Sequence, residues 1–273
     1  DKFWGVRRAA ATALGEHATE SARNAIATGA KDTHPRVRRG VGRALGNFRR
    51  DEAAVKILKG MIDAEKRSDY VIAAALFGLA QTRSKEALPI LKKFLTRESH
   101  NDILRTSVLA ALPELRDEKA LDIALDRAKP GVPPYVRSAA LLCLARMWDF
   151  VEKKRHDEIR EALIAPMKDG SAPVRRAAYA AVAEVPDAKV AQRLAVQIEA
   201  EPVGLLKKIG RESLRAIHEH LGEQSRFGEL RKQFEDLQGE HKKLIGRVAE
   251  LEGRLNGTKG KGKKPKKTVR NRA

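Results

Sequence analysis

The chain has 273 residues, with 55 Lys and Arg against 36 Asp and Glu, a formal net charge of +19 and one cysteine. A single cysteine excludes an internal disulfide and is typical of a reducing compartment, so we expect the protein in the cytoplasm. No apolar run approaches the length of a membrane span, so we predict no membrane partner.

Taken in chain order, one short pattern recurs. An apolar residue, followed in most cases by Arg or Lys, returns at intervals of 31 to 38 residues: Val6-Arg7, Val37-Arg38, Val71-Ile72, Leu104-Arg105, Val136-Arg137, Val174-Arg175 and Leu206-Lys207. Each pair opens a helix rich in small apolar residues, and after each of the first six comes a polar turn and a second amphipathic helix. Residues 32–46 carry clear boundaries, because Pro35 suits the first turn of a helix and Gly46 suits its end.

These intervals predict the fold class. Two helices in about 33 residues cannot bury an apolar stripe alone, so neighbouring helical hairpins must stack. We therefore predict an all-α fold, with a HEAT-type α-solenoid of about seven helical hairpins in residues 1–222, a long coiled-coil-like helix in residues 223–256 and a disordered Lys-rich tail in residues 257–273. The many alanines let helices approach closely, which explains how a chain with 4% aromatic residues fills such a core.

The arginines of the apolar–basic pairs are predicted to form a structural ladder rather than a basic stripe. An arginine fork suits a fixed carboxylate, and Asp32, Asp69 and Asp169 come shortly before three of the pairs. The glycine-rich run 40–46 has the wrong spacing for a dinucleotide loop and is interpreted as helix interior. Cys143, within L-L-C-L-A, is interpreted as a buried thiol rather than a nucleophile.

From residue 227 on, the apolar pattern changes to heptads. Arg247 and Glu252 would occupy g and e positions, where partner helices exchange ion pairs. The pattern predicts either self-association through residues 227–255, as a parallel or antiparallel dimer, or a long helix that folds back on the solenoid. Three glycines, each costing about 1 kcal/mol of helix propensity, leave both alternatives open. The a and d positions alternate in steps of four and three at Leu230, Phe234, Leu237, His241, Leu244, Val248, Leu251 and Leu255.

The positive charge is unevenly distributed. Residues 257–273 carry eight Lys and Arg and no acid, residues 223–256 carry seven of each sign, and +11 therefore remains on residues 1–222. The Lys-rich end has the composition of a disordered segment. It could neutralise phosphates, and without interleaved aromatic residues that nucleic-acid binding is expected to be weak, unspecific and salt-sensitive. A purely solubilising tail is the alternative.

No catalytic, cofactor-binding or metal-ligating residue is predicted in this chain. Of the seven histidines only His218 is followed by Glu, and the residue four positions on is Gly222, so the zinc-peptidase pattern H-E-x-x-H is missed. Trp4 and Trp148, with Asp149 beside the second, could suggest a HEAT-like DNA-repair glycosylase, but they lie in separate repeats and we do not favour that interpretation.

The opening segment D-K-F-W-G-V-R-R-A-A-A-T-A-L-G is more specific than the other repeats. It resembles the D-x-F-W-G-V-R-x-x-A-A-x-x-L segment in the C-terminal HEAT-like region of bacterial gluzincin aminopeptidases, the membrane alanyl aminopeptidase family, over about residues 1–220. The resemblance implies that this chain is the helical domain that closes over an upstream catalytic domain and limits substrate access, with the zinc in that upstream domain. Phe3 and Trp4, at the start of the first helix, lead us to expect a preceding segment that covers them.

Three functional hypotheses follow. In the first, the chain is the non-catalytic C-terminal domain of a zinc metallo-aminopeptidase, and its partner is the catalytic domain of the same polypeptide. In the second, it is a stand-alone HEAT-repeat scaffold that binds protein partners and self-associates through its heptads. In the third, it is a nucleic-acid-associated scaffold that uses its basic tail.

Overall fold

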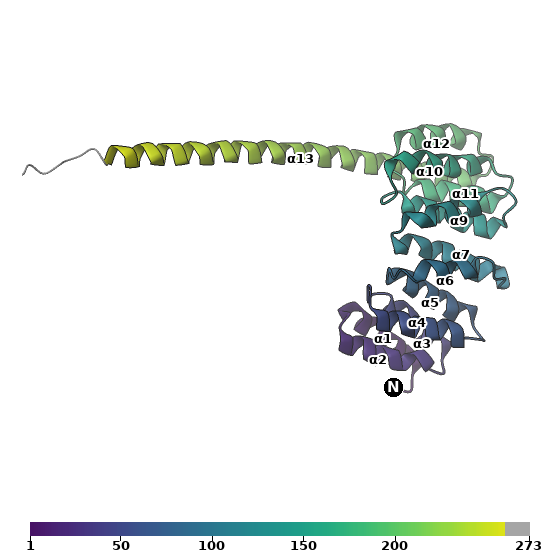
Figure 1. Ribbon diagram of the computed structural model, residues 1–273. Coiled ribbons are helices and arrows are strands. Elements are labelled where there is room, and N and C mark those ends of the chain that lie inside the picture. Colours follow the sequence, from purple (N-terminus) through teal and green to yellow (C-terminus); the bar gives the residue numbers. More distant parts are fainter. Residues whose placement is uncertain (260–273) are drawn as a thin grey trace, which may run out of the picture. The chain divides into compact units, whose positions relative to one another are not determined.

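The computed structural model describes residues 1–259, except for some side chains between residues 224 and 259, and this part of the chain is all-helical. Figure 1 shows the helices in chain order. Their bounds are α1 (Trp4–His17), α2 (Glu20–Thr28), α3 (Pro35–Leu45), α4 (Glu52–Ala64), α5 (Asp69–Gln81), α6 (Ala87–Phe94), α7 (Ile103–Ala111), α8 (Leu121–Ala128), α9 (Pro134–Met147), α10 (His156–Ile164), α11 (Ala172–Val182), α12 (Ala188–Ala200) and α13 (Gly204–Lys259). Short 3-10 turns stand in several of the connections.

The helices from α1 to α12 form successive hairpins, each made of an odd-numbered first helix and an even-numbered second helix. The hairpins stack one on the next, as Figure 1 shows, and the first helices form one continuous row in which α1 packs on α3, α3 on α5, and so on to α11. This is the predicted HEAT-type solenoid. The start of α13 occupies the next first-helix place, where Leu206 and Ile217 are buried.

The chain divides into two compact units, Asp1–Glu219 and the residues from His220 on. Helix α13 runs without a break from Gly204 across the boundary predicted at residue 222, and it ends at Lys259. Residues 260–273, which hold most of the predicted basic tail, lie outside the described residues.

Local sequence signals explain where the helices begin. Pro35 occupies the first turn of α3, where a missing N–H costs nothing. Asp51 caps α4 by accepting a hydrogen bond from the N–H of Ala54 at 3.0 Å, and Asp187 caps α12 in the same way. Each such cap stabilises its helix by about 1 kcal/mol.

Small residues let the first helices approach to backbone contact. Gly42 of α3 faces the backbone of Ala74 and Ala75 on α5, and a Cβ placed on Gly78 would collide with the carbonyl oxygen of Gly42. Alanines such as Ala75 and Ala111 are fully buried in the same row. The aromatic-poor core is therefore filled by short side chains and close helix axes, as the composition predicts.

Candidate functional site

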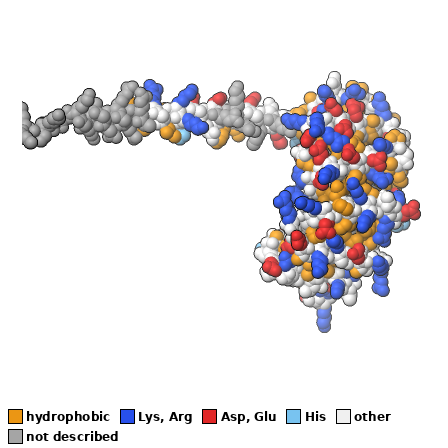
Figure 2. Space-filling view, in the orientation of Figure 1, with side chains coloured by type: hydrophobic (Ala, Val, Ile, Leu, Met, Phe, Trp, Pro, Cys, Tyr) orange, Lys and Arg blue, Asp and Glu red, His pale blue; other side chains and the backbone are white. Residues whose placement is uncertain are grey.

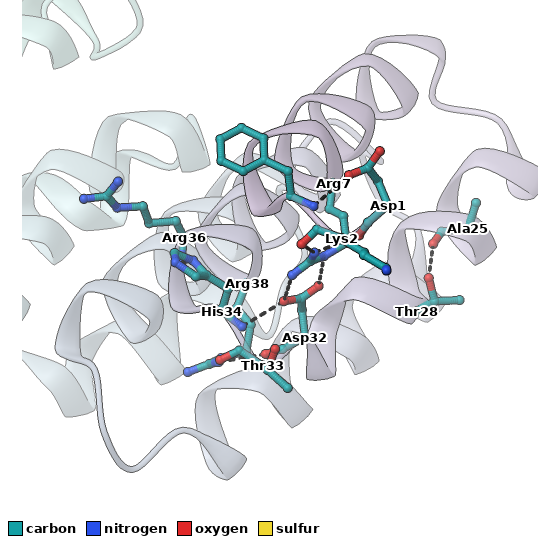
Figure 3. A network of polar contacts seen from close by, with 11 residues as sticks. Asp1, Lys2, Arg7, Ala25, Thr28, Asp32, Thr33, His34, Arg36 and Arg38 are labelled. Atoms are coloured by element: carbon teal, nitrogen blue, oxygen red, sulfur yellow. Dashed lines mark hydrogen bonds and ion pairs between the residues drawn. The ribbon is translucent and has the colours of Figure 1, made fainter.

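The arginines of the apolar–basic pairs face carboxylates, as the ladder interpretation predicts. Arg7 Nε lies 2.7 Å from Asp32 Oδ2, and Arg137 Nη2 lies 2.6 Å from Asp169 Oδ2. Figure 3 shows the first pair, in which Asp32 also accepts a hydrogen bond from the backbone N–H of His34 at 2.8 Å. Two of the three predicted carboxylates therefore belong to the ladder.

The third carboxylate was predicted wrongly. Asp69 opens α5 in its first turn, and Arg38 instead pairs with Glu65, whose Oε2 lies 2.8 Å from Arg38 Nη2. In the later repeat Arg175 pairs with Glu201 at 3.1 Å. Glu65 and Glu201 occupy the same place as Asp32 and Asp169, directly after the second helix of a hairpin.

The ladder carboxylates have lowered pKa values. Hydrogen bonding from Arg7 is the largest cause at Asp32. Burial alone would raise the pKa of Glu201, but hydrogen bonds from Arg175, from a backbone N–H and from Tyr179 hold it below its ordinary value. Burial and the same Glu201 raise the pKa of Tyr179 to about 12. The carboxylates are therefore ionised near neutral pH, Tyr179 stays protonated, and each ion pair ties a first helix to the end of its own hairpin.

The structure places the other residues that the sequence singled out apart from one another. Cys143 is buried in α9, and burial raises the pKa of its thiol, as expected of an inert side chain. Trp148 is buried against His156, with ring centroids 3.8 Å apart. The segment 218–220 is exposed on α13, and among the described residues no three His, Cys, Asp or Glu side chains gather as metal ligands. The glycine-rich run 40–46 lies in α3 and at its C-terminal end.

A second set of arginines lies on the opposite side of the first helices from the ladder. Arg36, Arg39 and Arg43 occupy positions i, i+3 and i+7 of α3 and therefore share one face, while Val37 and Val41 turn into the core. In Figure 3 the side chain of Arg36 extends away from the ladder residues around Asp32.

These arginines line a groove of about 540 Å³ that is formed by α1, α3 and α5. This volume is within the ~300–1,000 Å³ range of clefts that hold ligands. We call it the arginine groove. Its lining includes Arg8 of α1, Arg36, Arg39 and Arg43 of α3, and Phe77 and Gln81 of α5.

Aromatic rings hold the guanidinium groups of the arginine groove in place. Arg36 Cζ lies 4.8 Å from the ring centroid of Trp4, and Arg43 Cζ lies 5.1 Å from that of Phe77. Arg39 stands over Tyr70 at 5.2 Å, and Arg8 over Trp4 at 5.5 Å. A guanidinium stacked on a ring keeps its N–H groups free at the edge, so it is oriented but still able to donate hydrogen bonds.

The arginine groove also lacks the carboxylates that neutralise the ladder. Within the described residues, none of its four arginines forms an ion pair, and Glu16 supplies the single carboxylate among the lining residues. Oriented guanidinium groups without counter-charges are suited to bind carboxylate or phosphate oxygens. This site was not predicted from the sequence, where only the arginines of the apolar–basic pairs were considered. The i, i+3, i+7 spacing of Arg36, Arg39 and Arg43 places them on one helix face, and this shared face is the part of the site that the sequence could have shown.

A second exposed feature lies on α13 beyond residue 219. Six apolar side chains of the predicted heptad seam are between 53% and 63% exposed: Leu230, Phe234, Leu237, Leu244, Val248 and Leu251. A continuous apolar stripe of this kind on a helix surface is typical of a segment that binds a partner.

The sequence matches one known family. Residues 1–69 and 64–145 fit the family model for HEAT repeats, and together they span more than half of the 273 residues. The chain belongs to the HEAT-repeat family. None of the helices in residues 1–259 combines the length and hydropathy that a membrane span requires.

No curated protein matches the chain in sequence. Among solved structures, the complex of CpcE and CpcF of phycocyanin lyase from Nostoc sp. PCC7120 is 21% identical, covers 60% of this chain and 99% of that chain, and has a TM-score of 0.48. Human deoxyhypusine hydroxylase in complex with glycerol is 16% identical over 80% of this chain and 81% of that one, with a TM-score of 0.40. A designed armadillo repeat protein in complex with the peptide (KR)4 is 16% identical, covers 76% of this chain and 98% of that chain, and has a TM-score of 0.44.

The prediction that this chain is the accessory domain of a zinc aminopeptidase is wrong. The opening segment that suggested it, within residues 1–69, matches the model for HEAT repeats, and no curated protein matches the chain in sequence. The residues behind the resemblance have roles within the solenoid: Arg7 belongs to the ladder, and Trp4 stacks on His34 at 4.9 Å. Phe3 remains 59% exposed, and the zinc site expected upstream loses its support.

Proposed function

We propose that this chain is a non-catalytic HEAT-repeat scaffold whose arginine groove binds an acidic segment of a protein partner. The observation that supports it is the contrast between two sets of arginines on the same helices. Arg7 and Arg38 are neutralised by Asp32 and Glu65. The groove arginines are held over aromatic rings with their donors free. HEAT repeats generally act in protein–protein interaction, which agrees with this assignment.

The aromatic rings favour a polypeptide over a nucleic acid. Binding of single-stranded nucleic acid relies on aromatic faces that are open to stack bases. Here His34 is stacked on Trp4 with the two planes at 6°, and Arg8 and Arg36 lie over the same ring. Elsewhere the charges are mixed: Figure 2 shows acidic and basic side chains side by side over α10 to α12. A local acidic peptide fits this distribution better than an extended phosphate backbone.

A titration of the full chain with a synthetic peptide tests the proposal. The probe is a ten-residue peptide rich in Glu and Asp, labelled at one end and compared with the same peptide in which every acid is an amide. The triple variant Arg36→Gln, Arg39→Gln and Arg43→Gln should lower the affinity for the acidic peptide at least tenfold, because each charge-assisted contact supplies about 0.5–1 kcal/mol.

A charge-matched control separates the groove from net charge. Lys85→Gln, Lys92→Gln and Lys93→Gln remove the same three charges beside and on α6, where all three side chains are exposed. This control should bind within twofold of the unaltered chain. Equal loss of affinity in both triple variants, or equal binding of the acidic and amide peptides, would remove the groove as the binding site.

A second proposed property is self-association through residues 227–255. The occupant of the exposed apolar stripe on α13 is a second copy of the chain, because a heptad seam with leucine at the d positions is complementary to itself. In sedimentation experiments the mass should rise with concentration toward that of a dimer. Leu237→Asp with Leu244→Asp should abolish the rise, whereas Lys243→Asp, which lies off the seam, should leave it intact. A monomer at every concentration would contradict self-association.

The basic tail, residues 257–273, offers an alternative that the same titrations test. If the tail rather than the groove attracts acidic ligands, deleting residues 257–273 should abolish binding of the acidic peptide, and single-stranded DNA should bind the full chain in a salt-sensitive way. The groove proposal expects the deletion to change the affinity for the acidic peptide by less than twofold.

A further inference from the structure

A row of arginines follows the turns that connect first and second helices. Arg50, Arg83 and Arg116 stand 33 residues apart at equivalent positions of successive hairpins, and all three have left-handed backbone conformations, with φ of 58°, 54° and 53°. With Arg49 they form what we call the arginine ridge. Glycine or asparagine fits this conformation with less strain than arginine does, so backbone geometry alone does not explain the choice of residue.

Each turn is also tied to the equivalent turn of the next hairpin. The N–H of Arg50 donates to the carbonyl oxygen of Thr82 at 2.7 Å. Arg83 Nε donates to the carbonyl oxygen of Glu114 at 3.4 Å, and Arg116 Cζ lies 4.9 Å from the ring centroid of Phe150. Arg50, Arg83 and Arg116 therefore recur along the solenoid at one per repeat, in turns that contact one another.

The ridge, like the groove, is not neutralised. Among the described residues no ion pair involves any of its four arginines, and Glu114 pairs with Arg146 at 3.6 Å. Burial, Arg49 and Arg116 lower the pKa of Arg83, and Glu114 offsets part of that effect. Arginines that repel one another at a surface would be stabilised by a bound anion.

The ridge begins where the groove ends. Asn47 and Gln81 line the arginine groove at the C-terminal ends of α3 and α5. Arg49 and Arg50 follow the first of them within three residues, and Arg83 follows the second by two. A segment that leaves the groove past Asn47 and Gln81 therefore meets the ridge directly.

We infer that the arginine ridge is a second binding site for the same acidic partner, which extends from the groove along the turns of three successive hairpins. This inference rests on the proposed function of the groove. Neighbouring helices lie roughly 10 Å apart, so Arg50 and Arg116, two repeats apart, are separated by about 20 Å, a distance that about six residues of extended chain span. An acidic extension of eight residues is long enough to reach the ridge. Joining two binding segments in one chain raises affinity because the second contact becomes intramolecular.

The test uses the full chain and three peptides. The short peptide is the ten-residue acidic probe, and the two long peptides add eight acidic residues to its N-terminal or C-terminal end. One long peptide should bind at least tenfold tighter than the short one. Arg83→Gln with Arg116→Gln should lower the affinity for that long peptide at least fivefold and leave the short peptide within twofold. Arg83→Lys with Arg116→Lys, which keeps both charges, should retain at least half of the gain.

The outcomes separate the two proposals. If the short peptide binds through the groove but neither long peptide binds tighter, or if the ridge variant weakens short and long peptides equally, the ridge inference is refuted and the groove proposal stands. If the short peptide does not bind but a long one does, and only the ridge variant weakens it, the groove proposal fails and the ridge remains a binding site. Tighter binding of single-stranded DNA of equal charge, lost in the ridge variant, would overturn the assignment to a polypeptide.

Discussion

The guanidinium of Arg43 on α3 lies 5.1 Å from the ring centroid of Phe77 on α5, so a charged group of one repeat rests on an aromatic ring of the next. The same helix holds Arg38, which Glu65 neutralises. Helix α3 thus carries arginines with two different tasks, one fixing the end of its own hairpin and the other presenting unneutralised charge.

The ladder arginines should matter for stability. The residue Glu65 is only 8% exposed. In Arg38→Ala its carboxylate loses the counter-charge and retains the hydrogen bond that the backbone N–H of Arg67 donates to it. We expect the free energy of unfolding to fall by about 2 kcal/mol. Arg39→Ala, one residue on, removes an exposed arginine that has no ion pair in the described chain and should cost under about 0.5 kcal/mol. Urea denaturation measures both, and equal costs would contradict the division of tasks.

The ladder should also make stability depend on pH. Asp32, Glu65, Asp169 and Glu201 have lowered pKa values in the folded chain. A lowered folded pKa contributes stability that is present above the unfolded pKa of about 4 and is lost as pH falls through the folded pKa. The free energy of unfolding should therefore be flat from pH 7 to about 5 and decline below that. In Glu201→Gln the decline should be shallower, and an unchanged slope would show that this carboxylate does not contribute.

Close contact between the first helices predicts a contrast between two glycines. A methyl group at Gly78 would collide with the carbonyl oxygen of Gly42, so Gly78→Ala must push α3 and α5 apart. We expect it to destabilise the chain by about 2 kcal/mol or more. At Gly60 in α4 a Cβ meets nothing within 4 Å, so Gly60→Ala should instead stabilise by up to about 1 kcal/mol. Thermal denaturation shows whether each substitution stabilises or destabilises the chain. Destabilisation by both would refute the packing argument.

Arginine rather than charge alone should matter in the groove. Arg43→Lys keeps the charge and removes the planar fork that lies over Phe77. The variant should lose about 1 kcal/mol of binding free energy for the acidic peptide, close to fivefold, without a change in thermal stability. Titration with the ten-residue acidic peptide measures it. Binding equal to that of the unaltered chain would show that the groove acts as a diffuse positive field.

Much of the solenoid was predictable because its causes are local. The apolar–basic pairs mark each first helix, and Pro35 and Asp51 stand at helix starts where capping chemistry places them. The carboxylate partners were only partly predicted. Asp32 and Glu65 stand in equivalent places, five residues before Val37 and six before Val71. The prediction considered aspartates only, so it selected Asp69 in place of Glu65.

The groove was not predicted, since it depends on which arginines lack partners, and this is known only once neighbouring helices are in place. The role of Trp4 was not predictable for the same reason. In the sequence it contributed to the resemblance to an aminopeptidase, whereas in the fold it supports Arg36 and stacks on His34.

The most direct test of the groove is to locate a bound acidic segment. A ten-residue acidic peptide with a photo-reactive group at its centre is bound to the full chain and irradiated, and the attachment sites are mapped by mass spectrometry. The account predicts attachment within α1, α3 and α5, between Trp4 and Gln81, and loss of that attachment in the triple variant at Arg36, Arg39 and Arg43. Attachment mainly beyond residue 219, or at the same sites in the triple variant, would contradict it.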